Sequence, residues 1–153
     1  MSLLDSGSPL WTRRTRAIFR IVVGLLFIAH GTQKIFGFPP SPMPGMPVDP
    51  YTALGVAGII ELIGGTMIIL GLLTRPVAFL LAGEMAVAYF RVHFPRGVFP
   101  INNGGEPAVL YCFAFLYLMV AGAGAWSLDE MISRRRHGGQ PGNRQRRNID
   151  AAA

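Results

Sequence analysis

Cysteine, charged residues and recognisable cofactor motifs are all scarce in this sequence. Its single cysteine, Cys112, excludes an intrachain disulfide. Charged residues make up only 14% of the chain and hydrophobic residues 51%, whereas soluble domains carry nearly twice that share of charge. The sequence contains no phosphate-binding glycine loop and no motif for haem, flavin or a serine-hydrolase nucleophile, and no close His or Cys spacing indicates a metal site.

The charges that are present gather near the two ends of the chain. The net charge is +6, and most of it lies in two basic flanks, residues 13–20 and residues 134–147. Basic flanks beside apolar segments set the topology of membrane proteins and meet anionic lipid headgroups. The pattern therefore favours a bilayer as the partner of this chain, and no nucleic acid.

Four apolar stretches each approach the length of about 20 residues that a helix needs to cross a bilayer. They cover residues 17–36, 52–73, 76–94 and 107–126. Only helices satisfy the backbone hydrogen bonds of such segments in lipid. The first stretch has no small-x-small cleavage site, so we interpret it as a retained helix rather than a signal peptide. The expected fold is an all-α bundle of four transmembrane helices.

This interpretation divides the chain into a basic N-terminal flank (1–16), a four-helix membrane domain (17–130) and a basic, disordered C-terminal tail (131–153). Lys and Arg are concentrated before the first span, between the second and third spans and after the fourth, which predicts that both termini are cytoplasmic. The expected location is a cell inner membrane. Ser127 and Glu130 have capping-box spacing, which predicts a short cytoplasmic interfacial helix after the fourth span.

Several ionisable residues interrupt the apolar spans, where such groups are costly and usually face a bundle interior or a cavity. At 1.5 Å per residue, Glu61 and Glu84 fall within roughly 3 Å of the membrane midplane. His30 lies about one turn outward. His30, Gln33 and Lys34 share one helix face because they are three and four residues apart.

These faces predict one polar pocket that opens toward the outer half of the membrane. Its candidate residues are His30, Gln33, Lys34, Glu61, Glu84, Arg91 and Glu106. Two interpretations remain open. In the first, Glu61 pairs with Lys34, His30 or Arg91 only to hold the helices together. In the second, the cluster forms a site for a quinone headgroup or a proton relay. A third interpretation, transport, would need a continuous polar path to the cytoplasmic side of the membrane, and the sequence offers no such path between Glu84 and that side.

The order and spacing of several short motifs resemble the DoxX family over about residues 17–130. The motifs are His30-Gly31-Thr32-Gln33-Lys34-Ile35-Phe36-Gly37, Glu61-Leu62-Ile63-Gly64-Gly65, Gly71-Leu72-Leu73-Thr74-Arg75, His93 with Gly97 and Phe99, Glu106, and Gly122-Ala123-Gly124-Ala125-Trp126-Ser127-Leu128-Asp129. Family members commonly have Gly-Pro-Gly before the Ser-Leu-Asp, where this chain has Gly-Ala-Gly at 122–124.

The resemblance implies a four-helix membrane protein, in agreement with the spans counted independently. It also implies a subunit that supports electron transfer with the quinone pool, as part of a quinone-linked oxidoreductase or of a redox-stress complex with other membrane or redox subunits. The expected cofactor is then a quinone. The alternative is a non-catalytic structural or assembly subunit of a larger membrane complex.

Overall fold

The computed structural model describes residues 9–41 and 45–138, and within them every regular element is a helix. The long helices are α1 (Leu10–Phe36), α2 (Ala53–Leu70), α3 (Thr74–Ala88) and α5 (Glu106–Ala121). The helical segments η1 (Tyr89–His93), η2 (Phe94–Arg96) and α4 (Pro100–Asn103) connect α3 to α5, and α6 (Leu128–Gly138) follows. The predicted all-α class is confirmed. Most of the predicted disordered tail lies outside the described residues.

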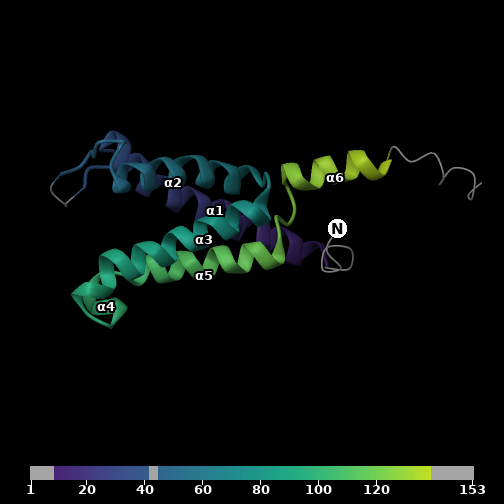
Figure 1. Cartoon of the computed structure of the whole chain (residues 1–153). Coiled ribbons are helices and arrows are strands. Elements are labelled where there is room, and N and C mark those ends of the chain that lie inside the picture. The colour runs from purple at the N-terminus through teal and green to yellow at the C-terminus, as the bar shows by residue number, and fades with distance from the viewer. Residues whose placement is uncertain (1–8, 42–44, 139–153) are drawn as a thin grey trace, which may run out of the picture.

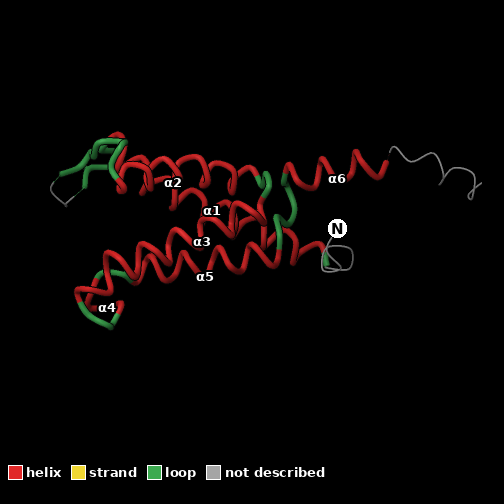
Figure 2. The backbone as a smooth tube through the Cα atoms, in the orientation of Figure 1, coloured by secondary structure: helices red, strands yellow, loops and turns green. Residues whose placement is uncertain are grey.

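The helices form an elongated bundle made of two pairs (Figure 1). α1 packs along α2, and α3 packs along α5, while α1 and α5 approach each other over little of their length. The loop between α1 and α2 lies at the same end of the bundle as α4, here called the α4 end. The start of α1, the short α2–α3 turn and α6 lie at the opposite end, here called the α6 end (Figure 2).

Three helices in the described part of the chain are long and apolar enough to cross a membrane: Leu10–Phe36, Ala53–Leu70 and the continuous segment Thr74–Arg96. The fourth apolar helix, α5, has 16 residues and is shorter. The first helix begins at Leu10, seven residues before the predicted span 17–36, so the basic residues 13–16 belong to the helix. Its 27 residues reach about 40 Å.

The outer surface of the bundle is strongly apolar. Large hydrophobic side chains on all four long helices are more than half exposed, among them Leu25, Ile63, Leu80 and Phe113. The buried core is smaller and lies mainly between α3, α5 and the inner face of α1. A soluble protein rarely exposes so much continuous apolar surface, so this exterior is suited to lipid.

Glycines bring α1 and α2 into close contact. A Cβ atom added to Gly65 would lie 2.7 Å from Ile28 Cγ1, and one added to Gly31 would lie 2.8 Å from the Gly58 carbonyl. Side chains at these positions would force the two helices apart. Small residues on both helices therefore permit the close approach of α1 and α2.

The starts of α3 and α6 are both capped by side chains of one short segment, residues 127–129. Thr74 does not cap α3; instead the Asp129 carboxylate, from the start of α6, accepts the N–H groups of Leu73 and Thr74 at 2.8 and 2.9 Å. Ser127 caps α6 by accepting the Glu130 N–H at 3.2 Å. The Glu130 carboxylate pairs with Arg13 and Arg134 rather than completing the capping box.

Two arginines of the basic N-terminal flank are buried rather than directed at lipid headgroups. Arg16 is 7% exposed, and Arg20 is fully buried. Arg20 donates to the carbonyls of Ile68 and Ile69 at the end of α2 and to Ala125 and Trp126 after α5. These carbonyls end helices or lie in a turn and need donors, which the guanidinium supplies.

Candidate functional site

An ion pair between α1 and α2 forms the centre of the candidate site. The Lys34 ammonium donates to Glu61 Oε1, and the Glu61 side chain is only 2% exposed while Lys34 is 17% exposed. Gly58 makes this approach possible, since a Cβ there would lie 3.0 Å from Lys34 Cβ. Of the partners that the sequence left open for Glu61, the structure selects Lys34.

The second carboxylate of the cluster, Glu84, comes from α3. Both of its carboxylate oxygens are buried and have no hydrogen-bond partner, and Glu61 Oε2 is also buried without one. The charges of Glu61 and Lys34 act on Glu84, so the three side chains form one electrostatic cluster. Three buried acceptor atoms without donors are exceptional, because buried polar groups are nearly always hydrogen-bonded.

Two aromatic side chains extend this cluster toward α5. The His30 ring lies edge-on to the Tyr111 ring with centroids 5.6 Å apart, and Tyr111 also contacts Phe27 at 5.2 Å. The charge of Lys34 acts on His30, and that of Glu61 acts on Tyr111. Tyr111 was not among the residues selected from the sequence. A phenol in an otherwise apolar span is the signal that could have found it, because a tyrosine hydroxyl normally has a polar partner.

An apolar groove lies along the side of the bundle where α1 and α5 separate. Its volume is about 610 Å³. It is lined by Phe19, Val23, Leu26, Glu106, Pro107, Leu110, Tyr111, Phe113, Ala114 and Tyr117. Tyr111 thus belongs both to the groove and to the polar cluster. The groove provides apolar space that reaches the cluster from the side of the bundle.

The remaining candidate residues lie outside the cluster. Gln33 donates to the Pro39 carbonyl at 3.1 Å and so orders the chain after α1. Arg91 is exposed on η1 and makes no ion pair with the described residues. Glu106 is exposed at the start of α5 and lines the groove. Among the described residues, no group of three or more His, Cys, Asp or Glu side chains could hold a metal ion.

Comparison with known proteins identifies the family of this chain. The family model for DoxX matches residues 15–94, which include α1, α2, α3 and the residues Lys34, Glu61 and Glu84. A Haemophilus influenzae protein without an assigned role is 48% identical over 122 residues, which cover 78% of this chain and 91% of the relative. The chain therefore belongs to the DoxX family, and its predicted membership is confirmed.

Other relatives carry informative names. The Escherichia coli inner membrane protein YqjF is 33% identical over 77% of this chain and 92% of its own length. A Bacillus subtilis protein named "Putative oxidoreductase CatD" is 27% identical over 80% of this chain and 90% of its own length. No solved structure matches the chain significantly. With the apolar helices, these relatives identify an integral membrane protein.

Proposed function

We propose that this protein spans the inner membrane four times, with both termini in the cytoplasm, and supports electron transfer with the quinone pool. The topology rests on charge. Eight described arginines belong to the elements at the α6 end, namely the first part of α1, the start of α3, and α6: Arg13, Arg14, Arg16, Arg20, Arg75, Arg134, Arg135 and Arg136. Among the described residues, the α4 end has only Lys34, Arg91 and Arg96, so the positive-inside rule makes the α6 end cytoplasmic. In this arrangement α5 and the residues flanking it form the fourth span.

The observation that carries the redox proposal is the set of unpartnered carboxylate oxygens on Glu61 and Glu84, with Tyr111 connecting Glu61 to an apolar groove. A quinone combines a headgroup with two carbonyl oxygens and an apolar isoprenoid tail. The groove between α1 and α5 suits the tail, and His30, Lys34 and Tyr111 offer donors for headgroup oxygens. The residues therefore fit a quinone.

A bound quinone supplies the redox chemistry, since its reduction takes up two electrons and two protons. This chain has no redox cofactor motif, so the electrons would come from a partner redox protein. The protein's own residues would handle the protons. Two carboxylates and one ammonium carry a net negative charge, which one proton on Glu61 or Glu84 would neutralise. That proton would be passed toward the headgroup, and the cluster would take up a second proton from outside for the second transfer. Lys34 holds the Glu61 carboxylate in place for this transfer.

The name of the Bacillus subtilis relative, which describes it as an oxidoreductase, supports the same class of chemistry for this chain. The proposal does not require catalysis by this subunit alone. It requires that the protein bind quinone and hold a proton beside it.

The decisive experiment measures binding of a short-chain ubiquinone to the purified protein by titration calorimetry. Glu84→Gln removes an acid but breaks no hydrogen bond, so we expect at least a tenfold loss of affinity with an unchanged melting temperature. Arg91→Gln is the matched control, because this charge is exposed and has no ion-pair partner in the described part of the chain. It should alter affinity less than twofold. Equal affinities in the wild type and in Glu84→Gln would remove the carboxylate cluster from the site.

The rival function, a structural or assembly subunit, is favoured by one observation: the Lys34–Glu61 pair joins α1 to α2 at a buried position. Removing one partner of a buried ion pair is strongly destabilising, by about 3–5 kcal/mol. The rival predicts that Glu61→Gln lowers the melting temperature while even the wild-type protein shows no quinone affinity. Detectable quinone binding by the wild type contradicts it.

A further inference from the structure

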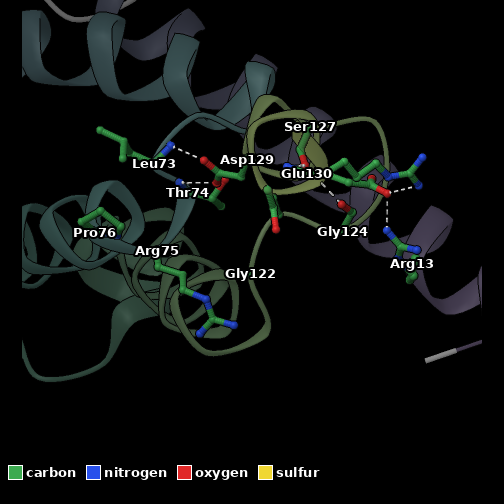
Figure 3. Close-up of a pocket in the computed structure, with 13 residues that line it drawn as sticks. Arg13, Leu73, Thr74, Arg75, Pro76, Gly122, Gly124, Ser127, Asp129 and Glu130 are labelled. Atoms are coloured by element: carbon green, nitrogen blue, oxygen red, sulfur yellow. Dashed lines mark hydrogen bonds and ion pairs between the residues drawn. The ribbon is translucent and has the colours of Figure 1, made fainter. Parts of the chain in front are cut away.

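A second pocket lies at the α6 end, where α3 and α6 begin and α5 ends, and no residue of the carboxylate cluster lines it (Figure 3). Its volume is about 470 Å³, in the range of small-molecule sites. Its polar lining comes from Arg13, Thr74, Arg75, Ser127, Asp129, Glu130, Ser133 and Arg134. We call it the basic pocket, because it contains three guanidinium groups and two carboxylates. Neither the proposed redox function nor the quinone site uses it.

Both carboxylates of the basic pocket are already engaged. Asp129 accepts the two backbone N–H groups at the start of α3, and Glu130 Oε1 accepts from both Arg13 and Arg134 at 2.5 Å. Figure 3 shows these bonds as two separate groups, and no dashed line joins Arg75 to either carboxylate. The positive charge of Arg75 therefore has no acidic partner in the pocket.

Arg75 and Thr74 have donor groups without partners. Arg75 Nη1 donates to the Met119 carbonyl at 3.1 Å, but Nη2 is buried and makes no hydrogen bond. Thr74 is fully buried, and its hydroxyl also has no partner. A guanidinium fixed by one bond and a neighbouring hydroxyl are the donors that recognise phosphate oxygens. An anion would satisfy both groups.

The position of the pocket indicates the source of that anion. The pocket lies at the end of the apolar bundle, where the lining residues Leu73 and Pro76 are exposed. Trp126 is 61% exposed at the same end, and tryptophan is enriched at membrane interfaces. Anionic headgroups of the cytoplasmic leaflet attract arginines close to the membrane surface. A phospholipid would place its phosphate at Arg75 and its acyl chains along the apolar exterior.

We propose that the basic pocket binds a phosphate group supplied by an acidic phospholipid, with Arg75 and Thr74 as its direct contacts. The test is native mass spectrometry of the purified full chain in non-ionic detergent. The protein is titrated with phosphatidylglycerol or with phosphatidylcholine of the same acyl chains. We expect phosphatidylglycerol to bind at least tenfold more tightly, and Arg75→Gln to abolish this preference.

Arg14→Gln is the matched control, because it removes the same charge from an exposed arginine at the same end that does not line the pocket. It should change the affinity less than twofold. Equal effects of the two variants would reduce the interaction to unspecific charge attraction and overturn the proposal. Equal binding of the two lipids would overturn it as well.

A second variant keeps the test valid if Arg75→Gln folds poorly. Thr74→Val replaces a buried hydroxyl that has no partner by a methyl group of similar shape, so the protein in phosphatidylcholine should be at least as stable as the wild type. We expect it to bind phosphatidylglycerol about tenfold more weakly. Unchanged binding would exclude Thr74 as a contact and overturn the assignment.

Inorganic phosphate distinguishes the two sources of the anion. The lipid assignment is overturned in favour of free phosphate if two results are found together. Millimolar phosphate would displace phosphatidylglycerol from the wild type, and phosphate would bind Arg75→Gln at least tenfold more weakly than the wild type. Phosphatidylglycerol binding that resists millimolar phosphate supports the phospholipid.

Discussion

Replacing Arg20 by methionine tests whether a buried cation holds the α6 end together. The guanidinium bonds to Ile69 and Trp126 at 2.7 and 2.9 Å join α2 to the segment after α5. The Ile68 carbonyl also accepts the Gly71 N–H, so it keeps a partner in the variant. The Ala125 bond is long, at 3.4 Å, and adds little. Each of the two carbonyls that lose a close donor, Ile69 and Trp126, costs about 1–3 kcal/mol. The expected loss of unfolding free energy is about 4 kcal/mol, the middle of the summed range.

For a chain of this size, each kcal/mol lowers the melting temperature by about 2–4 °C, so Arg20→Met should melt about 8–16 °C lower. The assay is thermal unfolding in phosphatidylcholine nanodiscs, followed by far-UV circular dichroism. Arg20→Lys keeps the charge but has one nitrogen instead of a two-armed fork, so we expect roughly half the loss. A drop of less than about 3 °C in Arg20→Met, or one no larger than in Arg14→Gln, would refute the reasoning.

Three further predictions concern packing, capping and pH. Gly58→Leu should lower stability by about 1–3 kcal/mol because Lys34 and Ile35 occupy the space, whereas Gly83→Leu, which meets nothing within 4 Å, should be tolerated in thermal unfolding. Asp129→Ala should cost about 1–3 kcal/mol in the same assay, since the part-buried Thr74 N–H loses its acceptor, whereas water can replace it at the exposed Leu73 N–H; a melting temperature equal to the wild type would contradict this role. Burial raises the pKa of Glu130, but the hydrogen bonds and charges of Arg13 and Arg134 outweigh it and hold the pKa below the usual 4.5. The ionised Glu130 carboxylate therefore stabilises the fold above pH 4.5, and this stabilisation is lost as the pH falls through the lowered pKa. On acidification, the melting temperature of the wild type should approach that of Glu130→Gln. A difference between the two melting temperatures that does not change with pH would contradict this linkage.

The secondary structure was accessible from the sequence because it depends on local rules. The apolar stretches mark the long helices, since only helices satisfy the backbone in lipid. The prediction located both ends of α2 within three residues and both ends of the continuous helical segment Thr74–Arg96 within two. The spacing of Ser127 and Glu130 marks the start of α6 in the same local way. Membership of the DoxX family was also accessible, because it depends on short motifs in a fixed order.

The candidate site was accessible only in part. Helical spacing placed His30 and Lys34 on one face, and the cost of ionisable groups in lipid drew attention to Glu61 and Glu84. Spacing within a helix, however, does not say how neighbouring helices are rotated about their axes. That rotation selected Lys34 for Glu61, left Glu84 without a donor and placed Arg91 outside the cluster.

Residues a few positions apart decide which helices form and which face of each is polar, so both follow from the amino-acid sequence alone. Which polar groups meet depends on contacts between residues far apart in the chain. Arg20 looks like a topology signal in the sequence, yet it bonds to residues 48 to 106 positions away and is fully buried. Asp129 caps a helix that begins 55 residues earlier. Only the tertiary structure decides these pairings, because packing sets the distances on which hydrogen bonds and charge interactions depend.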